Sequence, residues 1–186
     1  MRRIRRRTVA SLRQQAEPVP PQALAAFLPT WQGVGSKARG IDGVVQALSR
    51  LEGAAIAASA WESLSLPSRV RDYSPNLLDD VLSTGDYIWV GRGNLPNNDG
   101  WLSIYSRDAA PLLLPAWDEQ SLPATPLHQG ILTALKPGGA WFFRDVKSSL
   151  AATGINATDA AIANALWGLV WAGAITNDTF AALRAY

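Results

Sequence analysis

The sequence contains no cysteine, and this absence excludes several kinds of chemistry. Disulfide bonds, thiolate nucleophiles and sulfur-ligated zinc or iron sites all require that side chain. Histidine is nearly absent too, because His128 is the single histidine in 186 residues. A metal site with several histidines or a Ser-His-Asp triad is therefore hard to build. Stability must come from a packed core, for which the 48% of apolar residues is ordinary.

Long apolar segments are also missing from the sequence. No run approaches the roughly 18 apolar residues that a membrane-spanning helix needs. The basic start, Met1 to Arg7, is not followed by the apolar region of a secretory signal. We therefore expect a cytoplasmic protein in a reducing environment, with no membrane partner.

Positive charge is concentrated at the start of the chain. The whole sequence has 17 basic and 15 acidic residues, but residues 8–186 hold 12 basic and 15 acidic ones, a net charge of −3. The run of five arginines within residues 1–7 predicts contacts with nucleic-acid phosphates. The alternative is that these arginines form the solvated face of a helix. We expect a basic helix over 1–16 within an N-terminal segment, 1–20, that ends in a proline-rich linker. The run comprises Arg2, Arg3, Arg5, Arg6 and Arg7.

The spacing of apolar residues predicts a winged-helix module over 21–109. Helices are expected at 23–28, where Pro29 interrupts the pattern, and at 42–51, 60–66 and 76–84. β-branched and aromatic residues then predict strands at 87–90 and 101–105. The polar segment between these strands, 91–100, would be the wing.

Beyond this module, residues 110–126 contain four prolines and predict a linker. Similar elements then recur over 127–186. Helices are expected at 127–135, at 144–152 and from a cap at Thr158 to Gly173, with short strands at 140–143 and 174–176. We expect a mainly α chain with small β-hairpins, an α+β class made of tandem winged-helix modules, the second with a short or missing wing.

Three blocks of sequence resemble one family. Residues 60–92, the segment Gly-Ala-Trp-Phe-Phe-Arg-Asp at 139–145 and residues 165–184 are similar to Lhr-type (large helicase-related) superfamily 2 DNA helicases of bacteria. The likeness lies in the region that follows the helicase core and covers most of the chain. It implies a C-terminal winged-helix part of an ATP-dependent DNA helicase involved in DNA repair, with the rest of the helicase chain and its motor as partners.

The motifs of the helicase motor are absent from this sequence. The phosphate-binding pattern G-x-x-x-x-G-K-[ST] does not occur, because Lys37, Lys136 and Lys147 never follow a glycine, and there is no DEAD or DEAH tetrad. We expect a fragment without a catalytic motif, although the parent family hydrolyses ATP. No cofactor is expected here; ATP and magnesium belong to the parent helicase.

Candidate nucleic-acid contacts are cations, amides and one aromatic ring on predicted loops and a short helix. Helix 76–84 carries Asp79 and Asp80, which phosphates would repel, so we do not expect it to read the major groove. For the wing, the alternative is a polar turn without a binding role. For Arg144 and Lys147, on the predicted helix 144–152, the alternative is pairing with Asp145 or Asp159. The candidates are Arg69, Arg71, Tyr73, Arg92, Asn94, Asn97, Asn98, Arg144 and Lys147.

These observations leave three functions open. The first is binding of DNA by a non-catalytic part of a helicase. The second is a structural or interaction module that packs against the helicase motor or mediates oligomerisation, which the net acidic body favours. Trp167 and Trp171 share one helix face and fit a core or an inter-module contact. DNA glycosylase activity is the weakest, since its possible carboxylates, Asp145 and Asp178, have no identifiable partner.

Overall fold

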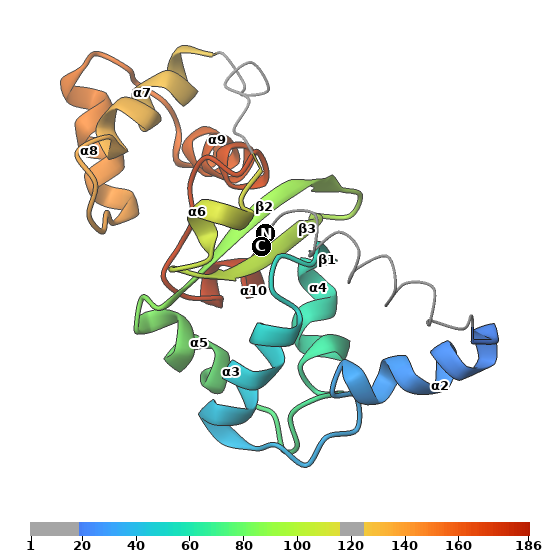
Figure 1. The fold of residues 1–186 in the computed structure, drawn as a ribbon. Helices are drawn as coiled ribbons and strands as arrows, with labels where there is room; N and C mark the ends of the chain where they lie inside the picture. Colours follow the sequence, from blue (N-terminus) through green and yellow to red (C-terminus); the bar gives the residue numbers. More distant parts are fainter. Residues whose placement is uncertain (1–18, 116–124) are drawn as a thin grey trace, which may run out of the picture.

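The computed structural model describes residues 19–115 and 125–186. The basic helix predicted over 1–16 and much of the predicted linker lie outside these ranges. The elements in chain order (Figure 1) are α2 (Pro21–Trp31), α3 (Gly40–Arg50), β1 (Ile56–Ala57), α4 (Ala58–Ala60), the π-helical turn η1 (Trp61–Ser65), α5 (Pro75–Ser83), β2 (Tyr87–Leu95), β3 (Asp99–Ser106), α6 (Ala110–Leu113), α7 (Pro126–Leu135), α8 (Phe143–Ala152), α9 (Asp159–Trp171) and α10 (Ala181–Arg184).

The first unit is a winged helix. Helices α3, α4 with η1, and α5 precede the hairpin β2–β3, and β1 completes an antiparallel sheet in the order β1-β3-β2. Ile56 pairs with Leu102, and Tyr87 pairs with Ser106. This arrangement confirms the predicted α+β class and the predicted winged-helix fold.

The core of this unit follows from the sequence pattern. Apolar residues recur every three or four positions in α3 and α5, so each helix has one stripe to bury. Trp61 and Trp89 are fully buried in the same core, and Trp61 Nε1 donates to the carbonyl of Leu102 at 3.2 Å. The two stripes comprise Val44, Ala47, Leu48, Leu51, Leu78, Val81 and Leu82.

The wing is shorter than predicted because its strands are longer. After an irregularity between Gly91 and Asn94, pairing resumes at Asn94–Gly100 and Leu95–Asp99. Only Pro96, Asn97 and Asn98 form the tip, and both asparagines have positive φ angles, of 63° and 54°. Asparagine tolerates this left-handed conformation, which a tight turn requires. The prediction of a loop across all of 91–100 is therefore wrong.

Helices α7, α8 and α9 form a second unit around their own core. Ile131, Val146, Leu150 and Leu169 are buried in it. The strands predicted at 140–143 and 174–176 are wrong, since residues 125–186 contain no strand. Gly138 and Gly139 adopt positive φ angles, and the exposed Phe142 is the N-cap of α8, so no second strand is available for pairing. The unit keeps three helices and lacks a wing.

The two units pack against each other through the C-terminal end of α9 (Figure 1). Val170 and Trp171 belong to the core of the winged helix, and the preceding Leu169 belongs to the core of the second unit. Gly91 and Gly100 allow this contact, because a Cβ atom on Gly91 would overlap the Val170 carbonyl and one on Gly100 would overlap the Trp171 ring. The boundary predicted within 110–126 stays a prediction.

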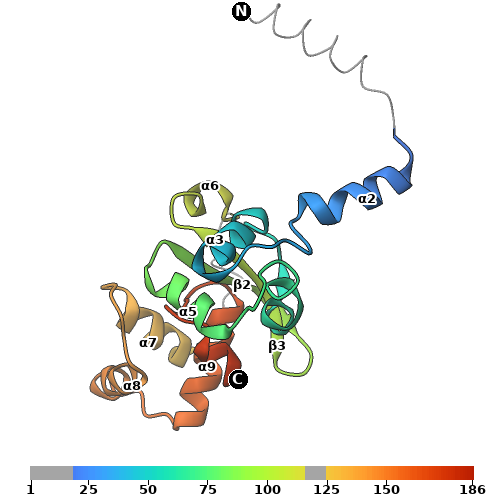
Figure 2. The same ribbon diagram turned by 90° about the horizontal axis from the view of Figure 1, so that it is seen from below.

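Helix α2 has no buried residue, although it is 11 residues long. Figure 2 shows it extending away from the rest of the chain. It continues to Trp31 with Pro29 inside it, so the predicted interruption at Pro29 is wrong. Within the described ranges, no helix has the length and apolar character needed to cross a membrane.

Candidate nucleic-acid interface

Helix α5 occupies the position of the helix that winged-helix modules usually insert into the major groove. In this chain the C-terminal segment contacts it. Asp79 on α5 accepts hydrogen bonds from the backbone N–H of Phe180 at 2.8 Å and from Arg184 Nη1 at 2.6 Å. Phe180 is buried, and its ring meets Trp89 edge-on at 6.2 Å between centroids. The side of α5 that carries Asp79 is therefore engaged within the chain.

Arg184 links α5 to the preceding helical turn. Its Nε donates to Glu62 Oε2 at 2.6 Å, its Nη2 to Glu62 Oε1 at 3.0 Å, and its Nη2 also to the carbonyl of Pro75 at 3.2 Å. Hydrogen bonding to Glu62 and Asp79 raises the pKa of Arg184 above its usual value. These paired carboxylates neutralise the cation, so Arg184 stabilises the fold and is not available for a phosphate.

The candidate Tyr73 belongs to the same network. Its hydroxyl donates to Glu62 Oε1 at 2.6 Å. Burial, followed by the hydrogen bond to Glu62, raises the pKa of Tyr73 far above its usual value. The structure thus places the hydroxyl of Tyr73 on an internal carboxylate, with its ring half-buried.

The other two candidates of the connection before α5 differ in exposure. Arg69 is half-buried: its Nε donates to the carbonyl of Gln32 at 2.9 Å and its Nη1 to that of Ser65 at 2.9 Å. Arg71 is exposed, and its Nε lies 3.8 Å from an Asp72 carboxylate oxygen. Arg39, for which the sequence gives no signal, lies beside Arg71 through a parallel backbone bridge.

The candidates of the wing lie on its exposed edge. Arg92 is exposed in β2, Asn94 is exposed near the irregularity, and Asn97 and Asn98 form the tip. No ion pair is found for Arg92 among the described residues. Cations and amides at a hairpin tip suit contacts with phosphate oxygens.

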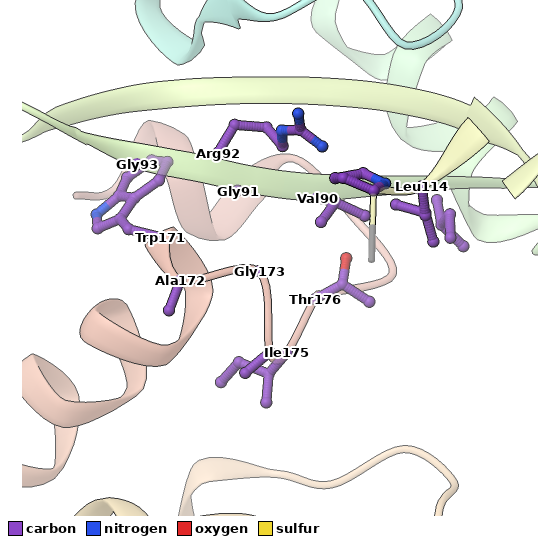
Figure 3. Close-up of a pocket in the computed structure, with 13 residues that line it drawn as sticks. Val90, Gly91, Arg92, Gly93, Leu114, Trp171, Ala172, Gly173, Ile175 and Thr176 are labelled. Carbon is purple, nitrogen blue, oxygen red and sulfur yellow. The ribbon is translucent and has the colours of Figure 1, made fainter. Parts of the chain in front are cut away.

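Arg92 also borders a pocket between β2 and the segment that follows α9 (Figure 3). The pocket has a volume of about 650 Å³, and Val90, Trp171, Ile175 and Leu114 are among its lining residues. Among the described residues that line the pocket, Arg92 is the one ionisable side chain, and none is a carboxylate, imidazole or thiol that could act as a general acid or base.

The candidates of the second unit lie on α8. Arg144 is exposed, with its Nε 3.9 Å from the carboxylate of Asp145, and Lys147 Nζ lies 2.6 Å from Asp159. Both cations are thus beside the acids that the sequence analysis named as alternative partners. The five N-terminal arginines lie outside the described residues.

The described residues do not fit a catalytic or metal centre. Asp145 pairs with its neighbour Arg144, and Asp178 lies on an exposed loop. No group of three or more His, Asp or Glu side chains in 19–115 and 125–186 could hold a metal ion. Because the sequence also lacks the phosphate-binding loop, these residues do not fit a bound ATP–magnesium complex.

Comparison with known proteins agrees with the fold. Residues 19–107 match the family model described as the winged-helix domain of the large helicase-related protein. A protein of Mycolicibacterium smegmatis named Lhr helicase/probable uracil glycosylase is 45% identical over 183 residues, which are 98% of this chain and 12% of that protein. The chain belongs to the Lhr-type helicase family.

A second Lhr relative gives the same picture. The Lhr helicase/uracil glycosylase of Escherichia coli is 37% identical over 201 residues, covering 99% of this chain and 13% of that protein. The family-model match contains α2 to β3, and the similarity to both relatives extends over the three-helix unit as well. This Lhr chain thus spans a small part of the length of the relatives that it matches.

Proposed function

We propose that this chain is the DNA-binding winged-helix part of an Lhr-type ATP-dependent DNA helicase that acts in DNA repair in the cytoplasm, and that it performs no catalytic step itself. One observation carries this proposal. Exposed arginines, Arg71 and Arg92, lie on the connection before α5 and on the wing, whereas α5 exposes Asp80 and has its Asp79 side engaged by the C-terminal segment. Loops and wing, and not α5, therefore provide the contacts.

The chemistry of these contacts predicts binding to the DNA backbone. Guanidinium groups and the amide of Asn97 donate hydrogen bonds to phosphate oxygens, and such contacts carry little sequence information. Each neutralised phosphate releases condensed counterions, so affinity falls as salt rises. The arginines at 2–7 add further phosphate contacts and so make the affinity depend more steeply on salt.

Fluorescence anisotropy with a labelled DNA duplex and a labelled single strand tests the proposal. We expect the full chain to bind with an affinity that falls steeply with salt. Replacing Arg92 with Ala should lower the slope of log affinity against log salt by about 1, and replacing Arg2, Arg3, Arg5, Arg6 and Arg7 with Gln should lower it further. Lys136→Ala on the second unit is the matched control. Absence of binding at low salt, or binding that salt does not change, would contradict the proposal.

A second function is favoured by the exposed surface of α2. Leu24, Phe27 and Trp31 are 51%, 53% and 64% exposed, and the rings of Phe27 and Trp31 lie 5.5 Å apart. A contiguous apolar surface of this kind is typical of a protein-protein contact. The chain would then pack through α2 against the helicase motor or against a second copy of itself.

Sedimentation velocity at several concentrations separates the two partners of α2. Concentration-dependent dimers that Trp31→Ser abolishes would indicate self-association. A monomer that binds a separately purified helicase motor through Trp31 would indicate the intramolecular contact. The exposed Leu112→Ser, away from α2, is the control.

A further inference from the structure

Two loops of the winged helix are joined by hydrogen bonds near the N-terminal end of α3. The N–H of Gly35 donates to the carbonyl of Ser68 at 2.7 Å, and the Ser36 hydroxyl donates to the carbonyl of Arg69 at 2.7 Å. The N–H of Arg71 donates to the carbonyl of Ala38 at 2.8 Å. The segments 33–39 and 68–71 therefore form one continuous surface although they lie far apart in the sequence.

Cations gather on this surface, which we call the basic ridge. Its acidic neighbours are Asp42, in the first turn of α3, and Asp72. Five cations therefore lie close together in a chain whose residues 8–186 are net acidic. The basic ridge comprises Lys37, Arg39, Arg50, Arg69 and Arg71.

Of these arginines, Arg69 supports the ridge from behind, whereas Arg50 is exposed at its side. Arg69 is fixed by the carbonyls of Gln32 and Ser65, and a Cβ atom on the buried Gly33 would overlap Nη1 of Arg50. Burial, followed by the positive charge of Arg50, lowers the pKa of Arg69. The smaller of these two causes indicates that the guanidinium groups of Arg50 and Arg69 lie close together.

Arg39 and Arg71 face the solvent on either side of the Asp72 carboxylate. Arg39 Nη2 lies 3.5 Å and Arg71 Nε 3.8 Å from the same oxygen, Oδ2 of Asp72. All three side chains are more than half exposed, with 56%, 60% and 71% of their surface accessible. A phosphate oxygen would take the place of this carboxylate oxygen, because two guanidinium groups already lie beside it.

We propose that the basic ridge binds the phosphodiester backbone of duplex DNA. Arg39 and Arg71 hold one phosphate, Lys37 contacts its neighbour, and Asp72 is the internal anion that the phosphate displaces. This inference rests on the proposed function and assigns it a surface. DNA fits better than an acidic peptide because the ridge lies on a winged-helix body, a fold that places cations against the DNA backbone.

Variants with effects of opposite sign test this proposal. In the full chain, Arg39→Ala with Arg71→Ala should weaken duplex binding roughly tenfold at low salt and lower the salt slope by about 1. Asp72→Asn should strengthen binding roughly two- to fivefold, the scale of an exposed ion pair. Asparagine also accepts the positive φ of 57° at this position, so the backbone is preserved.

Matched controls separate the ridge from net charge. Lys136→Ala removes one cation, and Asp108→Asn removes one acid from an exposed turn elsewhere. Circular dichroism verifies that each variant is folded. Equal effects of Asp72→Asn and Asp108→Asn on DNA affinity would contradict DNA binding by the ridge, and so would an unchanged affinity in the Arg39/Arg71 variant. Either result would leave the proposal that the chain binds DNA intact. A chain that binds no DNA at all would overturn the proposed function as well.

Discussion

Gly91 of β2 passes so close to Val170 of α9 that a Cβ atom on this glycine would overlap the Val170 carbonyl oxygen. The same atom would lie 2.9 Å from Cα of Trp171. Both contacts are with backbone, which cannot move aside as a side-chain end can. We expect Gly91→Ala to separate α9 from the hairpin and to lower the free energy of unfolding by about 1–3 kcal/mol.

Urea unfolding measures this effect. The adjacent exposed residue provides the control, since Arg92→Ala should change the free energy of unfolding by no more than about 0.5 kcal/mol. Equal unfolding midpoints for the two variants would show that α9 does not pack on the hairpin in solution.

Removing the cation that joins the C-terminus to α5 should also destabilise the chain. Arg184→Ala leaves Glu62 and Asp79 without their shared partner, and we expect a loss of about 1–2 kcal/mol, because the site is only partly buried. Thermal unfolding with Arg144→Ala, an 89% exposed arginine, gives the comparison. If both substitutions cost the same, the network contributes no stability.

Tyr73 makes stability depend on pH in the alkaline range. Its folded-state pKa is raised, first by burial and then by Glu62, whereas the unfolded chain has the usual value of about 10. A raised pKa means that the contribution is complete below pH 10 and is lost as pH rises above it, because only the unfolded state then releases the proton. Unfolding free energies between pH 8 and 11 should fall more steeply for the natural chain than for Tyr73→Phe. Parallel curves would contradict this assignment.

The chain by itself should not excise uracil. The relatives carry uracil glycosylase in their names, but Asp145 pairs with Arg144 and Asp178 lies on an exposed loop, so neither has a buried site for a flipped base. A gel assay with a uracil-containing duplex should show no abasic product, while a known uracil-DNA glycosylase should produce it. Cleavage by this chain would contradict its proposed non-catalytic role.

The first unit could be predicted because its signals are local. Ser74 followed by Pro75 marks the start of α5, and Leu78, Val81 and Leu82 give it one apolar face. Ser74 is indeed the N-cap, although its side chain makes no capping hydrogen bond. Such signals require only the neighbouring residues, and they determine where a helix forms.

Strand pairing depends on partners that local patterns do not reveal. Trp141 and Phe142 have the character of a strand, yet they remain exposed coil because no second strand lies beside them. In the wing the opposite occurs: polar residues such as Asn94 pair because β3 continues alongside β2. Local patterns therefore predicted two strands that do not form, and they made both strands of the wing too short.

The candidate contacts were chosen by residue type, which does not reveal whether a side chain is exposed. Arg71 and Arg69 are alike in the sequence, and only the fold determines that one faces solvent while the other binds main-chain carbonyls. Arg39 was missed because its proximity to Arg71 depends on hydrogen bonds between two distant loops. No sequence signal distinguished Arg184 from a surface cation.

Helix α9 supplies buried residues to both cores, so neither unit has a complete interior without it. Cutting the chain in its proline-rich segment would leave Trp89 and the back of the hairpin in water. A separate winged helix that ends near residue 109 should consequently be poorly folded and prone to aggregation. Amide hydrogen exchange in β2 should become slow only when residues up to 180 are present. Transplanting this module into another protein would require its helical neighbour as well.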